Sequence, residues 1–578
     1  MSAQPPTRTA AHATSATGTV ATATSATGTS AAVPSAQPAS RTMGELLFSA
    51  FTRYDDRTAF VDGDRTLTYA QSAARVQTIR EALRAAGARP GDYGALLGGS
   101  RPETFFCTAA IYLEGLRVSP LHPENGIRDH RQSLELAQVQ YLLYESGRFD
   151  AMARELAETV PGLTVVAVEI TDPGADGSGA AQAAGRAEAV SGFSVLDRPV
   201  RVDPEADASL GFSGGTTGAP KGIVRSHRTM VTNALYTVID WEWPADNRFL
   251  VTTPMSHASG AMALPILLQG GSMVMLDKFS PQAFVDAVAA HGITSTFLVP
   301  TMIYRVLDLP DEQLARLSSL ETVVYGASLM DPSRMAEALT RIGPVFLQLY
   351  GQSEAPNLIS VLRKGDHDPT VPGRLASAGR PTSCADVTIR DDDDREVPPG
   401  QVGEVCVTGP IVMTGYWQNP ELTAETLRGG RLHTGDLGRI DAHGFLSIVG
   451  RKKDMVITGG LNVYPAEVEA RMLEHPAVAE ACVVGVPDAD WGERLVAAVV
   501  LREGAVAEVP VAGVPAGEVR AGEGGAAALA EEIRAFVRDE KGSVQTPKDI
   551  EFVESIAVTK IGKPDKGAMR EQLAESLG

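Results

Sequence analysis

The feature that most constrains the fold is a regular alternation of helix-like stretches and short apolar runs that begins near residue 43. Residues 72–87 have the spacing of an amphipathic helix, whereas 93–99, 139–145 and 163–170 are short apolar runs. Apolar runs of this length, separated by helices, are typical of parallel strands that are covered on both faces. The sequence therefore predicts an α/β fold built from parallel-type subdomains.

The pattern changes twice towards the C-terminus. Residues 384–450 contain short β-like runs separated by turns, which predicts a small β-rich subdomain. The section after Gly450 alternates helix-like and strand-like stretches and has the size of a separate α+β domain. We predict a large N-terminal domain over 43–450 and a small, mobile C-terminal cap domain over 451–578, with a loop insertion at about 503–528.

Two segments are expected to lie outside these domains. Residues 1–42 are mostly Ala, Thr, Ser, Gly and Pro and have too little apolar bulk to offset the entropy lost on folding. We therefore predict a disordered low-complexity tail. Residues 171–190 are rich in Gly, Ala and Asp, which predicts a surface insertion.

Composition and charge exclude several classes of protein. The formal net charge is −20, which argues against a general nucleic-acid or anionic-membrane binder. The sequence has no apolar run long enough to span a membrane and no signal-peptide pattern at its N-terminus. The four cysteines lie far apart with no C-x-x-C pair, so neither a disulfide framework nor a zinc cluster is indicated. We expect a cytoplasmic protein.

The segment from Gly211 to Gly222, GFSGGTTGAPKG, has the composition of a phosphate-binding loop. Glycines let backbone amides point inward, hydroxyls add donors, and Lys221 adds a positive charge. It is not a Walker A loop, because Lys221 is followed by glycine instead of Ser or Thr. The predicted ATP-binding residues of this segment are Ser213, Gly214, Gly215, Thr216, Thr217, Gly218 and Lys221.

At this segment the chain resembles the adenylate-forming superfamily of acyl- and aryl-CoA synthetases, whose pattern is close to [ST]-S-G-T-T-G-x-P-K-G. Gly214 stands where Ser is commoner. The resemblance extends in order over roughly residues 43–573. It implies ATP-dependent conversion of a carboxylic acid to an acyl adenylate with release of pyrophosphate, followed by thioester formation with CoA. The cofactors it implies are ATP, Mg²⁺ and CoA.

Three further motifs match the family and assign nucleotide contacts by resemblance. In Tyr350-Gly-Gln-Ser-Glu354, Glu354 is implied to bind Mg²⁺ together with Thr216. Asp436, in Thr-Gly-Asp, is implied to bind the ribose hydroxyls, which suits a carboxylate because each of its oxygens accepts one O–H. The remaining residues implied to lie at the nucleotide are Gly326, Ala327, Ser328, Tyr350, Gly351, Ser353 and Arg451.

The C-terminal motifs imply a domain that changes position between two half-reactions. Lys563, in Thr-Lys-Ile-Gly-Lys, resembles the family's adenylation lysine, a cation that can stabilise the charge of carboxylate attack on the α-phosphate. The resemblance places the hinge at Lys453. Rotation about the hinge is then expected to bring Gly459 and Gly460 to the site, where they line the tunnel for the pantetheine thiol.

Residues near the expected acyl pocket suggest a substrate class. His257, in Pro-Met-Ser-His, resembles a family histidine that gates thiol access. No Asp occurs in this stretch, which argues against an α-amino acid. Because unpaired buried polar groups are costly, polar pocket residues favour a compact, substituted, aromatic acid over a long fatty acid. The predicted substrate-binding residues are Ser256, Ser259, Gln352, Ala355 and Asn357.

Two other activities stay open on the same fold. The acceptor could be the phosphopantetheine thiol of a separate carrier protein, or the enzyme could activate nitrite and diazotise an aromatic amine. A non-catalytic nucleotide-binding protein ranks last, because it predicts the loss of at least one key side chain and all of them are present. These side chains are Lys221, Glu354, Asp436, Arg451 and Lys563.

Overall fold

The computed structural model describes residues 41–170, 196–213, 221–256, 258–328, 330–458, 460–488, 491–502, 523–558 and 564–577. The predicted insertion at 171–190, most of the one at 503–528 and all but the last two residues of the predicted tail lie outside the described residues. Helix α1 (Met43–Phe51) begins at Met43, where the side chain of Thr42 caps it by accepting a hydrogen bond from the backbone N–H of Glu45.

A seven-stranded sheet carries the phosphate motif at one side. Its central strands pair in parallel, as predicted, whereas the last two strands on the motif side are antiparallel. In spatial order the strands are β18 (Gly415–Tyr416), β8 (Lys221–Ser226), β7 (Asp207–Ser213), β4 (Arg117–Pro120), β3 (Tyr93–Leu97), β5 (Tyr141–Glu145) and β6 (Thr164–Val168). Helices of this part of the chain include α2 (Tyr69–Ala85), α3 (Pro102–Leu113), α4 (Ile127–Ala137) and α5 (Asp150–Thr159).

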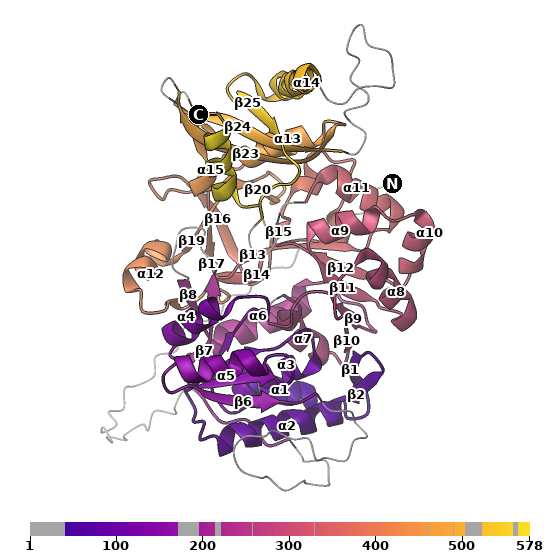
Figure 1. Ribbon diagram of the computed structural model, residues 1–578, viewed down its shortest axis with the longest axis vertical. Coiled ribbons are helices and arrows are strands. Elements are labelled where there is room, and N and C mark those ends of the chain that lie inside the picture. Colours follow the sequence, from indigo (N-terminus) through magenta and orange to yellow (C-terminus); the bar gives the residue numbers. More distant parts are fainter. Residues whose placement is uncertain are drawn as a thin grey trace, which may run out of the picture. The chain divides into compact units, whose positions relative to one another are not determined.

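A nine-stranded sheet forms the other half of the large domain (Figure 1). From β1 to β13 its neighbours are parallel, while β2, β14 and β15 add antiparallel edges. Its order is β15 (Arg380–Pro381), β14 (Ala355–Leu362), β13 (Phe346–Gln352), β12 (Thr322–Tyr325), β11 (Ser295–Leu298), β9 (Arg248–Val251), β10 (Ser272–Met275), β1 (Thr58–Asp62) and β2 (Arg65–Thr68). Its helices include α6 (His227–Asp240), α7 (Ala258–Leu268), α8 (Pro281–His291), α9 (Pro300–Leu307), α10 (Asp311–Leu314) and α11 (Pro332–Arg341).

The predicted β-rich subdomain is a four-stranded antiparallel sheet. It contains β16 (Asp386–Arg390), β17 (Gly403–Thr408), β19 (Leu432–Ile440) and β20 (Leu446–Arg451), with helix α12 (Pro420–Thr426) between β17 and β19. Strand β20 includes Arg451, which pairs in register with Asp436 of β19. The sheet therefore extends one residue past the predicted boundary at Gly450, and the short 3-10 helix η5 (Lys452–Asp454) follows it.

The chain after η5 forms a small α+β unit with its own sheet, as predicted. Valines and leucines of its strands and helices pack into a core that includes Val456, Val483, Leu495 and Ile533. The described elements are β21 (Val456–Thr458), β22 (Leu461–Val463), α13 (Pro465–Leu473), β23 (Val478–Asp488), β24 (Gly492–Leu501), α14 (Glu523–Lys541), β25 (Asp549–Phe552) and α15 (Lys566–Leu577). Helix α14 begins inside the predicted insertion, so residues 523–528 are helical and not a loop, consistent with their high Ala content.

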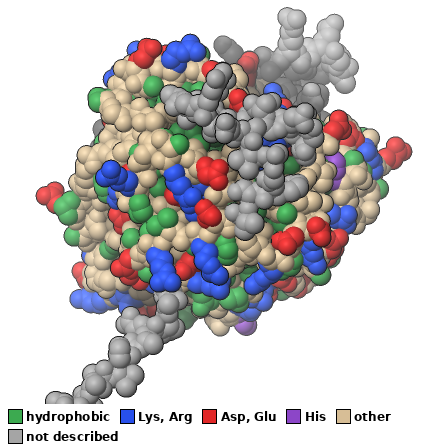
Figure 2. Space-filling view, turned by 90° about the horizontal axis from the view of Figure 1, so that it is seen from below, with side chains coloured by type: hydrophobic (Ala, Val, Ile, Leu, Met, Phe, Trp, Pro, Cys, Tyr) green, Lys and Arg blue, Asp and Glu red, His purple; other side chains and the backbone are tan. Residues whose placement is uncertain are grey.

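The charges on the surface and the lengths of the helices are two further features of the described residues. On the face shown in Figure 2, basic and acidic side chains are interspersed among the described residues. Such mixing gives no extended cationic surface on that face for a polyanion. Among the helices that the structure describes, none is both long enough and apolar enough to cross a bilayer.

Candidate active site

Several predicted site residues lie outside the described residues, and their roles stay predictions. They are Gly214, Gly215, Thr216, Thr217, Gly218, His257, Gly459 and Lys563. The described residues nevertheless bring most of the other motifs together.

The phosphate motif lies between two antiparallel strands. Ser213 at the end of β7 and Lys221 at the start of β8 are opposite each other in register, so the two ends of the motif lie side by side. Lys221 is exposed, and its Nζ lies 5.7 Å from the centroid of the Tyr416 ring. The cation predicted to meet the phosphates is therefore held at the beginning of a paired strand.

Three separate motifs converge at one carboxylate, which we call the ribose corner: Tyr350, Asp436 and Arg451. The hydroxyl of Tyr350 donates to Oδ2 of Asp436 at 2.5 Å, and Nε of Arg451 forms an ion pair with Oδ1 at 2.6 Å. Asp436 is only 4% exposed. Burial, and then the charge of Asp436, raise the pKa of Tyr350 well above its usual value, so the phenol stays a donor.

The turn that carries Asp436 is fixed by its own hydrogen bonds. The hydroxyl of Thr434 donates to the carbonyl of Val405 at 2.7 Å and accepts from the backbone N–H of Asp436 at 3.0 Å. Gly435 has a φ of 69°, a conformation that suits glycine. Its N–H donates to Oε1 of the buried Glu404 at 3.1 Å. The Thr-Gly-Asp motif is thus a rigid support for the ribose corner.

Glu404 belongs to a buried polar cluster beneath this turn. Nδ1 of His433 lies 3.2 Å from Oε2 of Glu404 and 3.3 Å from Sγ of Cys406, and ligand atoms of Asp394, Cys406 and His433 lie within 4.8 Å of one another. Cations within 4 Å of the two carboxylates are Arg390, Arg428 and Lys452. Because these positive charges oppose a divalent cation, we interpret the cluster as an ion-pair network that supports the turn.

A second carboxylate, Glu354, lies in the turn between β13 and β14, and we call Glu354 and Tyr416 the metal corner. The hydroxyl of Tyr416 donates to Oε1 of Glu354 at 2.8 Å. The backbone carbonyl of Glu354 accepts from the N–H of Met413 at 2.7 Å. Burial, followed by the charge of Glu354, raises the pKa of Tyr416. The carboxylate is therefore oriented through one oxygen, as a single-carboxylate Mg²⁺ ligand would need.

Two glycines allow the strands beside the predicted adenine site to approach closely. A Cβ on Gly326 would lie 2.6 Å from the carbonyl oxygen of Leu349, and one on Gly351 would lie 2.3 Å from the backbone nitrogen of Asn357. Ala327 has a φ of 70°, which is uncommon for a residue with a side chain. Such conformations are found most often at binding sites, in agreement with the predicted role of this segment.

The polar residues predicted to line the acyl pocket are mostly engaged by the protein. Ser259 is fully buried, and its hydroxyl lies 2.7 Å from the hydroxyl of Thr253. The side-chain amide of Gln352 donates to the carbonyl of Thr434 at 3.3 Å, and Ser256 also has an interaction partner. Ala355 packs in the large apolar core. Groups that already have one partner in the protein depend less on a hydrogen-bonding substrate, which weakens the argument for a substituted acid.

Family models match both domains. The model described as AMP-binding enzyme matches residues 47–417, and the one described as AMP-binding enzyme C-terminal domain matches residues 467–563. This chain belongs to the AMP-binding enzyme family. The predicted resemblance to the adenylate-forming superfamily is thereby confirmed.

Relatives of this AMP-binding enzyme include acyl-CoA ligases, and a solved amide bond synthetase is also similar to it. It is 41% identical, over 93% of its own length and 90% of the relative's, to the medium/long-chain fatty-acid–CoA ligase FadD8 of Mycobacterium tuberculosis. It is 34% identical to a feruloyl-CoA synthase of Amycolatopsis sp, over 89% and 96% of the two chains. The solved amide bond synthetase McbA of Marinactinospora thermotolerans is 33% identical, with a TM-score of 0.78 over 92% of this chain and 99% of McbA.

This AMP-binding enzyme is an AMP-forming acyl-CoA ligase that uses ATP, Mg²⁺ and CoA. The ribose and metal corners offer a carboxylate each, and Mg²⁺ prefers such oxygen ligands. The carboxylate of Glu354 is therefore a chemically suitable ligand for Mg²⁺.

The hinge segment of the AMP-binding enzyme is anchored on its N-terminal side. Lys453 is exposed within η5, and its neighbour Lys452 forms a 2.7 Å ion pair with Asp392. Gly460 lies at the exposed turn between β21 and β22 with a φ of 78°. The hinge role of Lys453 and the tunnel role of Gly460 stay predictions.

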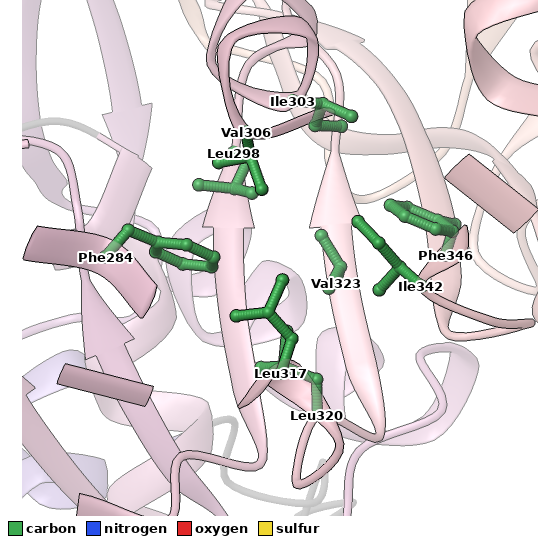
Figure 3. Close-up of a pocket in the computed structure, with 9 residues that line it drawn as sticks. All are labelled: Phe284, Leu298, Ile303, Val306, Leu317, Leu320, Val323, Ile342 and Phe346. Carbon is green, nitrogen blue, oxygen red and sulfur yellow. The ribbon is translucent and has the colours of Figure 1, made fainter. Parts of the chain in front are cut away.

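A separate void lies inside the nine-stranded half of the AMP-binding enzyme. Figure 3 shows its side chains pointing towards one another from strands and helices, and all of them are apolar. They are Phe284, Leu298, Ile303, Val306, Leu317, Leu320, Val323, Ile342 and Phe346. Because no side chain here can hold a carboxylate, the void is a packing feature of the core and not the acid site.

Sequence patterns missed two residues that shape the site. Tyr416 lies in a Gly-Tyr-Trp stretch without a recognisable motif, and Glu404 lies two residues before Cys406 in a strand. Their roles depend on which distant residue they meet, Glu354 in one case and Gly435 in the other. What marks Glu404 is its burial opposite the Thr-Gly-Asp turn, and this position is visible only once the fold is known.

Proposed function

We propose that this acyl-CoA ligase activates acids with an apolar tail, in the range of medium- to long-chain fatty acids. The observation that carries this proposal is that the buried Ser259 hydroxyl lies beside the Thr253 hydroxyl and that the Gln352 amide donates to the carbonyl of Thr434, so each side chain has one partner within the protein. An apolar tail loses no hydrogen bonds in such surroundings, so its burial is favourable. The relative at 41% identity, named as a medium/long-chain fatty-acid–CoA ligase, supports the same class.

Substituted aromatic acids are the second candidate. The feruloyl-CoA synthase relative supports them, and the half-buried Asn357 keeps a polar side chain near the predicted pocket. The two classes differ in what the pocket must supply, because a phenolic ring needs a hydrogen-bonding partner for its hydroxyl and an alkyl chain does not.

In the proposed first half-reaction, the described corners hold the nucleotide while the acid attacks. Glu354, with Thr216, would hold Mg²⁺, and the bound metal would supply positive charge against the phosphates. Asp436 accepts hydrogen bonds from the ribose hydroxyls, and Lys221 meets the terminal phosphates. One carboxylate oxygen of the acid bonds to the α-phosphorus, and pyrophosphate leaves. Lys563 stabilises the negative charge that develops there.

In the proposed second half-reaction the small domain turns about Lys453. Gly459 and Gly460 then line the path of the thiol, whose sulfur attacks the acyl carbon and releases AMP. A carrier-protein thiol in place of CoA, and nitrite in place of the acid, are the alternatives that the experiment separates. A cytoplasmic location, where ATP and CoA are available, stays a prediction.

Pyrophosphate release by the purified protein tests the substrate class. The acids to compare are hexanoate, decanoate, palmitate, benzoate and ferulate, each with and without CoA, a carrier protein and nitrite. We expect decanoate or palmitate with CoA to give the highest kcat/KM. A preference for ferulate would favour the second candidate, and release that depends on nitrite would overturn both.

A lysine pair tests the two-step mechanism. Lys563→Ala should abolish adenylation and leave thioester formation from a supplied acyl adenylate largely intact. Lys566→Ala is the control, because Nζ of Lys566 is engaged 2.7 Å from Glu469 and its loss should lower stability more than adenylation. Equal loss of both half-reactions in Lys563→Ala would show that Lys563 does not act in the first step alone.

A further inference from the structure

We propose that Arg225 forms an anion subsite that binds the carboxylate of the acid substrate before adenylation. The inference rests on the acyl-CoA ligase activity and adds a substrate contact that no sequence motif indicated. Its evidence is the place of Arg225 in strand β8, the space left for its guanidinium, and an Nε atom that is buried without a hydrogen-bond partner among the described residues.

Strand β8 fixes where Arg225 points. It lies four residues after Lys221 and pairs in register with Ser209 of β7. Ile223, two residues earlier and therefore on the same face, is 1% exposed in the large apolar core. Ser226, the next residue, caps helix α6. Strand pairing on one side and the start of helix α6 on the other fix the backbone at Arg225.

The neighbouring strand leaves room for the guanidinium at one glycine. A Cβ on Gly211 of β7 would lie 3.0 Å from the Nη2 atom of Arg225. This distance is shorter than ordinary contacts between a methyl group and nitrogen, so a side chain there would displace the guanidinium. Gly211 thus belongs to the shape of the subsite, next to its place at the start of the phosphate motif.

One nitrogen of the guanidinium has no acceptor within the described part of the chain. Its Nε is buried without a hydrogen-bond partner. Burial lowers the pKa of Arg225, against the opposing effects of nearby Tyr112 and Glu354. A guanidinium nitrogen that is buried without an acceptor is unfavourable, so an anionic ligand would gain from meeting it.

The fully buried Arg80 shows how this chain treats a purely structural arginine. Nε of Arg80 forms an ion pair with Glu114 at 2.6 Å, and its Nη atoms donate to the backbone carbonyls of Asp197 and Arg198 at 2.6 and 3.1 Å. All three nitrogens of that guanidinium are therefore satisfied by the protein. Arg225 differs because its buried Nε atom has no hydrogen-bond partner in the described part of the chain and can donate to a ligand.

The nature of the anion follows from the neighbours of Arg225. Glu354 interacts electrostatically with it, so the subsite borders the proposed Mg²⁺ ligand and the phosphates that accompany the metal. Those phosphates already have Lys221 and Mg²⁺ as cations, whereas the acid carboxylate has no cation assigned in the large domain. A guanidinium fork matches a carboxylate, keeps it ionised and offsets its repulsion from the triphosphate. One carboxylate oxygen is held while the other attacks.

The test compares Arg225→Met with a matched control, Arg228→Met. Arg228 is exposed and pairs with Glu205 at 2.6 Å. The control substitution therefore removes the same charge from the same chain segment without changing the subsite. Pyrophosphate release is measured with decanoate and with ferulate, so the result does not depend on the acid class. We expect Arg225→Met to raise the KM of the acid about 30-fold and to change the KM of MgATP less than about threefold.

Charge recognition gives a readout that a structural role would not move. Decanamide, the neutral analogue, should inhibit the wild type far more weakly than decanoate binds, and Arg225→Met should lose most of this preference. Arg225→Lys should restore part of it, and Gly211→Ala should weaken decanoate binding by displacing the guanidinium. An unchanged preference in Arg225→Met, or an equal rise in both KM values, would overturn the proposal. An inactive wild type with every acid would instead contradict the proposed substrates.

Discussion

The two carboxylates of the site, Asp436 and Glu354, are held in different ways. Asp436 is 4% exposed and has both oxygens engaged, one by Tyr350 and one by Arg451. Glu354 is partly exposed and is oriented through one oxygen by Tyr416. The ribose corner is therefore arranged before the nucleotide arrives, whereas the metal corner keeps a ligand position for the cation.

This difference indicates that the metal corner depends on its ligand for charge compensation more than the ribose corner does. Breaking a preformed buried pair leaves an uncompensated charge, which costs several kcal/mol at full burial and less where one partner is exposed. Arg451 is 46% exposed, so water compensates it in part. A change at Glu354 leaves the protein pairs largely intact and acts through the metal. Substitutions at the two corners should consequently give different balances of stability and activity.

The largest effect should come from Glu354→Gln. An amide is a poor Mg²⁺ ligand and removes one negative charge, so kcat/KM for pyrophosphate release should fall about 100- to 1,000-fold. Titration of the rate with Mg²⁺ checks this, because the variant should need more metal, while thermal unfolding should change little. If Glu354→Gln required the same Mg²⁺ concentration as the wild type, the role given to Glu354 would be contradicted.

Asp436→Asn should have the next largest effect, on nucleotide binding and on stability together. The amide accepts only through its oxygen and leaves Arg451 without its counter-ion, so the KM of ATP should rise about 10- to 100-fold. The variant should also discriminate less between ATP and 2′-deoxy-ATP. Asp392→Asn is the control, because that side chain is 90% exposed and pairs only with Lys452 among the described residues. Similar effects in both variants would reject a specific ribose contact.

Tyr416→Phe should lower activity by about tenfold. It removes the hydroxyl that donates to Glu354, so the carboxylate is less well oriented, although the charge on it remains. The expected signature is a lower kcat at saturating Mg²⁺, in contrast to the altered metal requirement of Glu354→Gln. Wild-type kcat in Tyr416→Phe would show that the metal orients Glu354 without help.

Tyr350→Phe should give the smallest change, about threefold in the KM of ATP, because Arg451 still holds Asp436. The pKa of Tyr350 is raised, so its phenol remains protonated as the pH increases through the usual range of tyrosine. The wild type should therefore lose no activity through this group between pH 7 and pH 10. A loss of activity near pH 10 that is absent from Tyr350→Phe would contradict the raised pKa.

Much of the fold was predictable because burial leaves a local trace. The runs at 93–99, 139–145 and 163–170 correspond to β3, β5 and β6, since strands covered on both faces are continuously apolar. The antiparallel strand β14 was not foreseen, because Ala355–Leu362 follows the Tyr350–Glu354 motif without a turn signal beyond it. Local pattern does not say whether a chain that leaves a strand will fold back beside it.

The site divides in a similar way. Lys221, Glu354, Asp436 and Arg451 could be proposed because their motifs have fixed spacing. The structure adds the ion pair between Asp436 and Arg451 and the contacts of Lys221 and Glu354 with Tyr416. Tyr416, Glu404 and Arg225 were missed, since each matters through a residue far away in the sequence. The inferred polarity of the acyl pocket had the opposite problem. Ser259 was expected to bind the substrate, but its hydroxyl already lies 2.7 Å from the hydroxyl of Thr253.

Strand β20 reaches through Arg451, and the hinge follows it. Turning the chain at Lys453 therefore leaves the backbone pairing between β19 and β20 intact. What such a turn would disturb includes an ion pair across the hinge: Nη1 of Arg439 in β19 lies 3.1 Å from Oε1 of Glu467 in α13, and both side chains are partly exposed. Contacts of this kind weaken as ionic strength rises. Salt should accordingly act on the exchange between half-reactions before it acts on the fold, which makes ionic strength a variable to control in every rate measurement.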